Sequence, residues 1–215
     1  MPGSSLWLLP PPTHPLFPIL TKLISSTLPA KFPSEAASSP KVTPHFFSPH
    51  MTLTSDISPS VYGSDPQAWL DSLPFPSVDK VRVRFGKVKS QDFFYRRCYI
   101  SVGYEDVEEI TGVARARGVY GEHDQQGEKT KEWLEWWRKE SGPHVSLMYG
   151  DVPITEEKMR EIGQVVASAG VTLPEDEQIT KEERKGHDGW EGGVVWLVPS
   201  DGPIEDWKPI AVREL

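Results

Sequence analysis

The spacing of apolar residues predicts the elements of the first part of the chain. Residues 4–9 form a nearly unbroken apolar run, which indicates a strand. Between Pro15 and Leu28 the apolar residues lie three or four positions apart, so we expect a helix with one buried face. Residues 29–44 are rich in Pro, Ser and Ala, and their apolar positions follow neither a strand period nor a helix period, which indicates a flexible surface loop.

The rest of the chain alternates between strand and helix patterns. A short polar segment separates two of the strand patterns, at 78–88 and 93–102, so these two are expected to form a hairpin. The order lacks the strict βαβ rhythm of a Rossmann sheet and predicts an α+β fold, with residues 1–215 as one domain. The strand patterns occupy residues 46–57, 78–88, 93–102, 144–151, 192–200 and 207–215, and the helix patterns occupy residues 64–73, 104–117, 129–140 and 155–169.

Length and charge restrict the class of partner. A chain of 215 residues can form one sizeable domain or two small lobes that share a core. It carries 31 acidic and 23 basic residues, for a net charge of -8. Proteins that hold long nucleic acid by counterion release need many positive charges, so we do not expect such a partner. A small anionic substrate needs positive charge only within one cleft, and it remains compatible with this composition.

The cysteine content and the N-terminal segment bear on location. Cys98 is the single cysteine, so no disulfide can form within the chain, as is usual in reducing compartments. The apolar run near the N-terminus has no basic segment before it, and prolines interrupt it, so we expect neither a signal peptide nor a membrane span. We therefore expect an intracellular, cytoplasmic protein without a membrane partner. We also expect a monomer.

Two of the predicted strands contain the same short motif. One reads Pro-His-Met-Thr-Leu around His50 and Thr52, and the other reads Pro-His-Val-Ser-Leu around His144 and Ser146. Side chains two positions apart in a strand share a face, so each strand offers one imidazole and one hydroxyl to the same side. The apolar residues between them then point into a core.

Two such strands that face each other supply the groups needed to hydrolyse a cyclic phosphodiester. One imidazole takes a proton from water, the other protonates the leaving ribose oxygen, and the hydroxyls donate hydrogen bonds to phosphate oxygens. One copy of the motif is weak evidence, because a strand histidine beside a hydroxyl is common. The second copy with matching flanks favours catalytic histidines over structural ones. Which histidine is the acid and which is the base stays open.

The remaining histidines and cysteine do not form a metal motif. His45 lacks a paired hydroxyl, because Phe47 occupies the second position after it, which favours a loop or packing role. The sequence contains no H-E-x-x-H motif, no cysteine-rich spacing and no glycine-rich P-loop. We therefore expect no metal and no cofactor.

The tryptophans permit two interpretations. Trp133, Trp136 and Trp137 share one face of a helix, which is more typical of a core stripe than of a platform for base stacking. Trp190 lies shortly before a strand and two glycines, where its ring could stack on a nucleobase or pack at the sheet edge. We include Trp190 as a candidate substrate-binding residue.

The two motifs, PHMTLTSDI and PHVSLMYGD, occur together with an opening SLWLLPPPTHPLFPILTKLI and a later GWEGGVVWLV. This combination resembles the fungal 2′,3′-cyclic-nucleotide 3′-phosphodiesterases, which are members of the two-histidine (2H) phosphoesterase superfamily. The resemblance spans nearly the whole chain. It implies a bilobal fold with two antiparallel sheets, flanked by helices, around a central cleft.

The resemblance also implies roles for individual residues. His50 and His144 correspond to the catalytic pair, and Thr52 and Ser146 to the phosphate-binding hydroxyls. Tyr149 matches a substrate-contacting tyrosine of related plant enzymes. The chain departs from the family pattern in having Ser rather than Thr in the second motif, which keeps the hydroxyl, and in the Pro/Ser-rich segment before His50.

The implied activity is hydrolysis of nucleoside 2′,3′-cyclic phosphates to the 2′-phosphate. ADP-ribose 1″,2″-cyclic phosphate from tRNA splicing is a further candidate substrate at the level of the family. The chemistry of the two motifs alone does not fix which ribose oxygen leaves. Two alternatives stay open: an RNA-end 2′-5′ phosphodiesterase or nuclease of the same superfamily, and a non-catalytic module that binds RNA ends.

Overall fold

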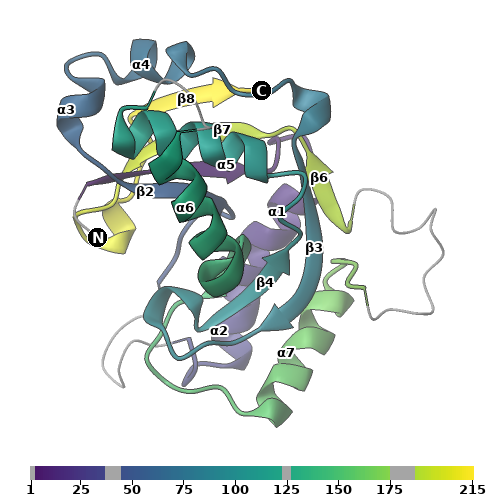
Figure 1. Ribbon diagram of the computed structural model, residues 1–215. Helices are drawn as coiled ribbons and strands as arrows, with labels where there is room; N and C mark the ends of the chain where they lie inside the picture. The colour runs from purple at the N-terminus through teal and green to yellow at the C-terminus, as the bar shows by residue number, and fades with distance from the viewer. Residues whose placement is uncertain (1–2, 37–44, 123–126, 175–186) are drawn as a thin grey trace.

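The computed structural model describes residues 3–36, 45–122, 127–174 and 187–215. Within these residues, antiparallel strands form one curled sheet in the order β6-β3-β4-β5-β2-β1-β7-β8 (Figure 1). The α+β class predicted from the sequence is confirmed. The strands are β1 Ser4–Leu9, β2 Met51–Ile57, β3 Arg82–Lys89, β4 Cys98–Val102, β5 His144–Met148, β6 Gly189–Glu191, β7 Val194–Pro199 and β8 Ala211–Glu214.

Helices follow several of the strands. Four of them run directly into, or out of, a single turn of π-helix, and these three π-turns lie at Leu23–Thr27, Ala116–Tyr120 and Trp137–Ser141. Single 3₁₀ turns occupy Val78–Lys80, Phe94–Arg96 and Ile204–Asp206. The α-helices are α1 Leu16–Lys22, α2 Leu28–Lys31, α3 Pro59–Tyr62, α4 Pro66–Ser72, α5 Glu108–Arg115, α6 Glu128–Trp136 and α7 Glu156–Ser168.

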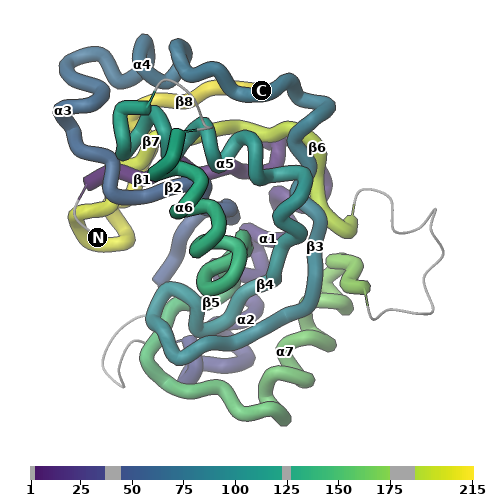
Figure 2. The backbone as a smooth tube through the Cα atoms, viewed as in Figure 1, coloured from purple at the N-terminus to yellow at the C-terminus, as the bar shows by residue number. Residues whose placement is uncertain are grey.

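The sheet has two halves that meet where β2 pairs with β5. Met51 lies opposite Val145 in this antiparallel pair, and Figure 2 shows β1, β2 and β7 above β3, β4 and β5. The expectation of two separate sheets in two lobes is not confirmed, because the β2–β5 pair joins all the strands into one order. The same pair brings the two histidine motifs side by side.

Two helical segments pack against the opposite half of the sheet from the strand that precedes them. Helix α5, which follows β4, packs against β2, while the π-turn Leu23–Thr27 and α2, which follow β1, pack against β5. In the view of Figure 1, α5 and α6 lie in front and α1 and α2 lie behind. The apolar face of the first helix explains this packing, since Leu16, Leu20 and Leu23 are fully buried.

The predicted loop at 29–44 needs a partial correction. Residues 29–31 continue the first helix as α2, and Phe32 and Ala36 beyond it are only 4% and 3% exposed. Burial of these two side chains anchors this part of the segment to the core, which its Pro- and Ser-rich composition concealed. Residues 37–44 lie outside the described residues.

The expected β3–β4 hairpin is confirmed, but its second strand starts later than predicted. Residues 94–96 form a 3₁₀ turn and β4 begins at Cys98. The aromatic residues before Cys98 favour a strand by propensity, yet the amide N–H of Arg96 donates to the Phe93 carbonyl and closes a turn. This turn directs its side chains towards the site described next.

Candidate active site

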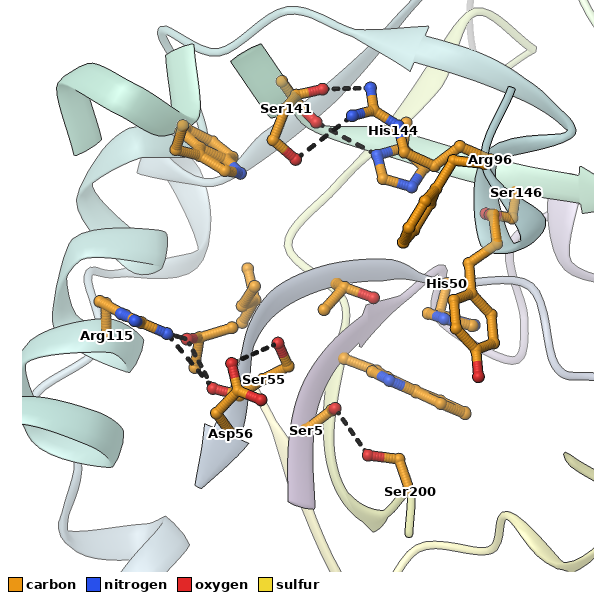
Figure 3. Close-up of a pocket in the computed structure, with 18 of the residues that line it drawn as sticks. Ser5, His50, Ser55, Asp56, Arg96, Arg115, Ser141, His144, Ser146 and Ser200 are labelled. Atoms are coloured by element: carbon orange, nitrogen blue, oxygen red, sulfur yellow. Dashed lines mark hydrogen bonds between the residues drawn. The ribbon is translucent and has the colours of Figure 1, made fainter. Parts of the chain in front are cut away.

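The two motif strands lie next to each other and present the same kinds of side chain to one cavity. The intervening residues Met51, Leu53, Val145 and Leu147 are at most 1% exposed and belong to the core. The histidine and hydroxyl of each motif line a cavity of about 470 Å³ (Figure 3). The structure thus brings together His50, Thr52, His144 and Ser146, and it adds Tyr149 to the same lining.

His50 is held rigidly between a backbone acceptor and an aromatic ring. Its Nδ1 lies 2.7 Å from the Ser48 carbonyl oxygen, and its ring stacks on Trp7 with a centroid separation of 3.7 Å and an interplanar angle of 9°. Because a carbonyl can only accept, Nδ1 carries the proton and Nε2 keeps its lone pair in the neutral ring. Burial lowers the pKa of His50 to about 4, with the Ser48 hydrogen bond opposing and nearby His144 adding to the shift.

His144 repeats this arrangement on the other strand. Its Nδ1 lies 3.1 Å from the carbonyl oxygen of Gly142, again two residues back, and its ring meets Tyr99 edge-on at 5.1 Å. Burial and, to a smaller extent, the positive charge of Arg96 lower the pKa of His144 to about 4, while the Gly142 hydrogen bond opposes both. Both imidazoles therefore share one tautomer and can exchange a proton at Nε2.

The two hydroxyls differ in their hydrogen bonds. Ser146 Oγ donates to the Tyr95 carbonyl oxygen at 2.9 Å and is 5% exposed. Thr52 is half-buried, and no hydrogen bond joins its hydroxyl to another described residue. The Thr52 hydroxyl is thus able to donate to a ligand as it stands, whereas Ser146 must first rotate its proton away from Tyr95.

Aromatic rings form one wall of the cavity. Tyr149 stacks on Phe47 with a centroid separation of 3.9 Å, and its edge contacts Tyr95 at 5.2 Å. Burial raises the pKa of Tyr149, so its hydroxyl stays protonated and can donate. Trp7 and Trp207 also line the cavity, and they meet edge-on at 5.9 Å.

Two arginines bring positive charge to the cavity. Arg96 donates to the Ser141 carbonyl and, at 3.4 Å, to Ser141 Oγ, and its guanidinium lies 5.0 Å from the Tyr99 ring centroid. Arg115 lies in the same lining, separated from Arg96 and His144 in Figure 3. Among the described residues, neither arginine forms an ion pair with a carboxylate. The acidic chain therefore still offers local positive charge for an anion.

Sequence reasoning missed Trp7, Arg96 and Arg115. Trp7 lies opposite Thr52 in the β1–β2 register, and that register depends on strand pairing that no local pattern reveals. The one local sign of a cationic site residue near Arg96 was the pair of adjacent arginines, Arg96 and Arg97, within an aromatic run. The side chain of Arg97, however, turns away towards the Gly150 carbonyl and Asp92. No motif distinguishes one arginine from the other.

The structure places Trp190 outside the cavity. It is 2% exposed on β6, where it lies opposite Val83 of β3 and meets Phe85 edge-on at 5.8 Å. A ring buried in this way has no face left for a nucleobase. Edge packing is the interpretation that fits, and Trp190 is no longer a site candidate.

The tryptophan stripe on α6 and the π-turn that follows it is only partly core. Trp137 is 4% exposed, as expected, but Trp136 is 52% exposed, and Trp133, Trp136 and Trp137 all line the cavity.

In the described part of the chain no three side chains of His, Cys, Asp or Glu gather closely enough to hold a metal ion. The described helices include none with the length and apolar character needed to cross a bilayer.

Fold and site together define a class: an α+β protein in which two adjacent antiparallel strands each present a histidine and a hydroxyl to one cavity. Comparison with known proteins agrees with this class and narrows it. The model of the family described as "Cyclic phosphodiesterase-like protein" matches residues 1–215, and the chain belongs to this family.

Three fungal proteins illustrate the similarity, each with the name 2′,3′-cyclic-nucleotide 3′-phosphodiesterase. The protein from Neurospora crassa is 60% identical over 217 residues, covering 100% of both chains. The protein from Phaeosphaeria nodorum is 41% identical over 216 residues, with the same coverage. The protein from Yarrowia lipolytica is 27% identical over 240 residues and 99% of each chain.

Proposed function

We propose that this protein is a 2′,3′-cyclic-nucleotide 3′-phosphodiesterase, which hydrolyses nucleoside 2′,3′-cyclic phosphates to nucleoside 2′-phosphates. The observation that carries the proposal is the pair of imidazoles, His50 and His144, in one cavity with both Nδ1 atoms bound to backbone carbonyls. The names of the full-length relatives support the same activity.

The two imidazoles suit a single displacement at phosphorus. In the proposed step, one Nε2 removes a proton from water, the water oxygen bonds to phosphorus, and the bond from phosphorus to the 3′ oxygen breaks as the second imidazole protonates that oxygen. One ring must start neutral and the other protonated. Exchange of protons with solvent then restores the starting pair.

The surroundings favour a particular assignment of the two roles. Arg96 favours the neutral form of His144, which is the form in which a general base must start. His50 has no arginine among the causes of its shift, and the negative charge of a bound cyclic phosphate stabilises its imidazolium. We therefore propose His144 as the base and His50 as the acid.

The hydroxyls and Tyr149 are proposed to bind the phosphate and the sugar. Thr52 donates to one non-bridging oxygen and Ser146 to the other after its proton leaves the Tyr95 carbonyl. Tyr149, kept protonated by burial, is a further donor beside Ser146. Since imidazoles and hydroxyls supply both proton transfer and charge stabilisation, we expect turnover without a divalent ion.

The test follows phosphorus NMR resonances while the protein acts on 2′,3′-cyclic AMP in the presence of EDTA. A parallel sample contains ADP-ribose 1″,2″-cyclic phosphate, the second candidate substrate. The proposal predicts that 2′,3′-cyclic AMP is converted to 2′-AMP at the same rate in the presence of EDTA as in its absence. Accumulation of 3′-AMP would overturn the regiochemistry. Absence of turnover of 2′,3′-cyclic AMP, with or without added Mg²⁺ or Zn²⁺, would overturn the activity.

A further inference from the structure

The cavity extends well beyond the two histidines. Its other end is lined by Ser55 and Asp56 at the end of β2, by Arg115 at the end of α5, and by Trp133 and Trp136 of α6. Figure 3 shows Arg115 on its helix, across the cavity from His144 and His50.

Arg115 is held in place by neutral groups alone. Its Nη1 donates to Thr54 Oγ1 and to the Ser55 carbonyl, both at 3.3 Å, and its Nη2 donates to the Tyr120 hydroxyl at 3.2 Å. Its guanidinium lies 4.8 Å from the centroid of the Tyr120 ring and 4.7 Å from that of Trp133. These contacts fix the orientation of the cation before any ligand arrives, so little side-chain entropy is lost on binding.

The charge of Arg115 has no counter-ion among the described residues, and its Nε is buried without a hydrogen-bond partner. Asp56 lines the same end, but its carboxylate accepts from the Ser55 hydroxyl at 3.3 Å. The guanidinium as a whole is half-buried and lines the cavity, so a phosphate there can pair with its charge, and this charge-assisted contact replaces hydration that burial has already removed.

Trp136 supplies a second element of recognition. It lines the cavity and is 52% exposed, whereas most large apolar side chains of the fold are buried. An exposed indole beside a phosphate-binding cation is suited to stacking against a nucleobase. Arg115, which is suited to binding a phosphate, and Trp136, which is suited to stacking on an aromatic ring, thus lie in one cavity.

We infer that Arg115 and Trp136 form a second subsite, which binds the linking phosphate and the neighbouring nucleoside of a dinucleotide-sized substrate that ends in a 2′,3′-cyclic phosphate. This inference rests on the proposed function for the reacting end. It makes Arg115 and Trp136 specificity-determining residues, which act on substrate choice and not on the bond that breaks.

The test compares three substrates that share one reacting end: 2′,3′-cyclic AMP, the dinucleotide adenylyl-(3′→5′)-adenosine 2′,3′-cyclic phosphate, and the same dinucleotide with an uncharged methylphosphonate link. For the wild type, kcat/KM should be at least about tenfold higher for the charged dinucleotide than for the mononucleotide. The uncharged analogue should lose most of that advantage, because it cannot pair with Arg115.

Two variants and one control locate the effect. Arg115→Gln should bring the charged-over-uncharged ratio close to one, and Trp136→Ala should lower kcat/KM for both dinucleotides relative to the mononucleotide. Arg138→Gln is the matched control, because Arg138 pairs with Glu108 and lies outside the cavity lining, and it should leave the ratios unchanged. Since Trp136 is half-exposed, its variant should fold even if the Arg115 variant does not.

The outcomes separate this inference from the proposed function. If the wild type fails to hydrolyse 2′,3′-cyclic AMP, the proposed function fails. If it hydrolyses the mononucleotide but shows no preference for the charged dinucleotide, the second subsite is wrong. A preference that survives both Arg115→Gln and Trp136→Ala also overturns it.

Discussion

At the scale of single residues, the two motifs are alike in sequence but different in their hydrogen bonds. The Thr52 hydroxyl bonds to no other described residue, while that of Ser146 donates to the Tyr95 carbonyl. We expect Thr52→Ala to lower kcat/KM by about 100-fold, as loss of a fixed oxyanion donor does. Its free energy of unfolding should change by less than about 1 kcal/mol, because no bond within the described fold is lost.

Ser146→Ala should combine two effects. It removes a proposed donor to phosphate, and it leaves the Tyr95 carbonyl without its partner, so we expect a similar loss of rate together with a loss of about 1–2 kcal/mol in stability. Ser146→Thr is the control, since it keeps the hydroxyl and should retain most of the rate. Steady-state kinetics and urea unfolding measure both quantities. A fully active Ser146→Ala beside an inactive Ser146→Thr would show that this hydroxyl does not hold phosphate.

At the scale of elements, β6 depends on a close backbone approach that only glycine permits. Gly189 has φ +143°, and a Cβ at this position would lie 1.8 Å from the Val83 carbonyl oxygen of β3. We expect Gly189→Ala to lower the free energy of unfolding by at least about 2 kcal/mol, because β6 must separate from β3. Gly103→Ala, whose Cβ would meet no atom within 4 Å, should change stability by less than about 1 kcal/mol. Equal effects of the two substitutions in thermal unfolding would contradict this account of β6.

Elements with a clear period could be predicted from the sequence, and those fixed by distant contacts could not. The strand patterns at 46–57 and 144–151 predicted β2 and β5, including which side chains share a face, although β2 begins only at Met51 and β5 ends at Met148. The 3₁₀ turn at Phe94–Arg96 is stabilised by tertiary bonds such as that from Arg96 to Ser141, which propensity does not include. The β2–β5 pair that unites the sheet is likewise a contact between residues far apart in the chain.

The same distinction applies to the site. The repeated motif identified His50, Thr52, His144 and Ser146, because strand geometry links a local pattern to one face. The positions of Trp7 and Arg115 in the cavity depend on strand register and on how a helix packs across the sheet. Trp190 was ambiguous because a tryptophan beside glycines occurs both at exposed platforms and at packed edges.

At the scale of the whole molecule, two buried neutral histidines couple folding to pH. Burial lowers the pKa of both His50 and His144 from 6.5 to about 4. Above about pH 6.5 neither imidazole is charged in either state, so neither affects stability. Between about pH 6.5 and 4 the unfolded chain binds protons that the folded chain does not, so the free energy of unfolding falls as the pH falls.

We expect the loss over this window to reach up to about 3 kcal/mol per histidine, at about 1.4 kcal/mol for each unit of pKa shift. Carboxylates titrate partly in the same range, so the informative quantity is the difference between the wild type and His50→Ala. That variant should show a shallower dependence on pH in urea unfolding. Identical slopes would show that His50 is not held neutral by burial.

The central claim is that His50 and His144 form one acid and base pair, and the rates of single and double variants test it most directly. Hydrolysis of 2′,3′-cyclic AMP should fall by about 10³-fold or more in His50→Ala and in His144→Ala, and their combination should cost much less than the product of the two losses. His187→Ala, which removes a half-buried histidine that is bound to the Gly170 carbonyl and lies outside the cavity lining, should match the wild type. A correctly folded His50→Ala or His144→Ala with near wild-type turnover, or fully multiplicative losses in the double variant, would contradict the account.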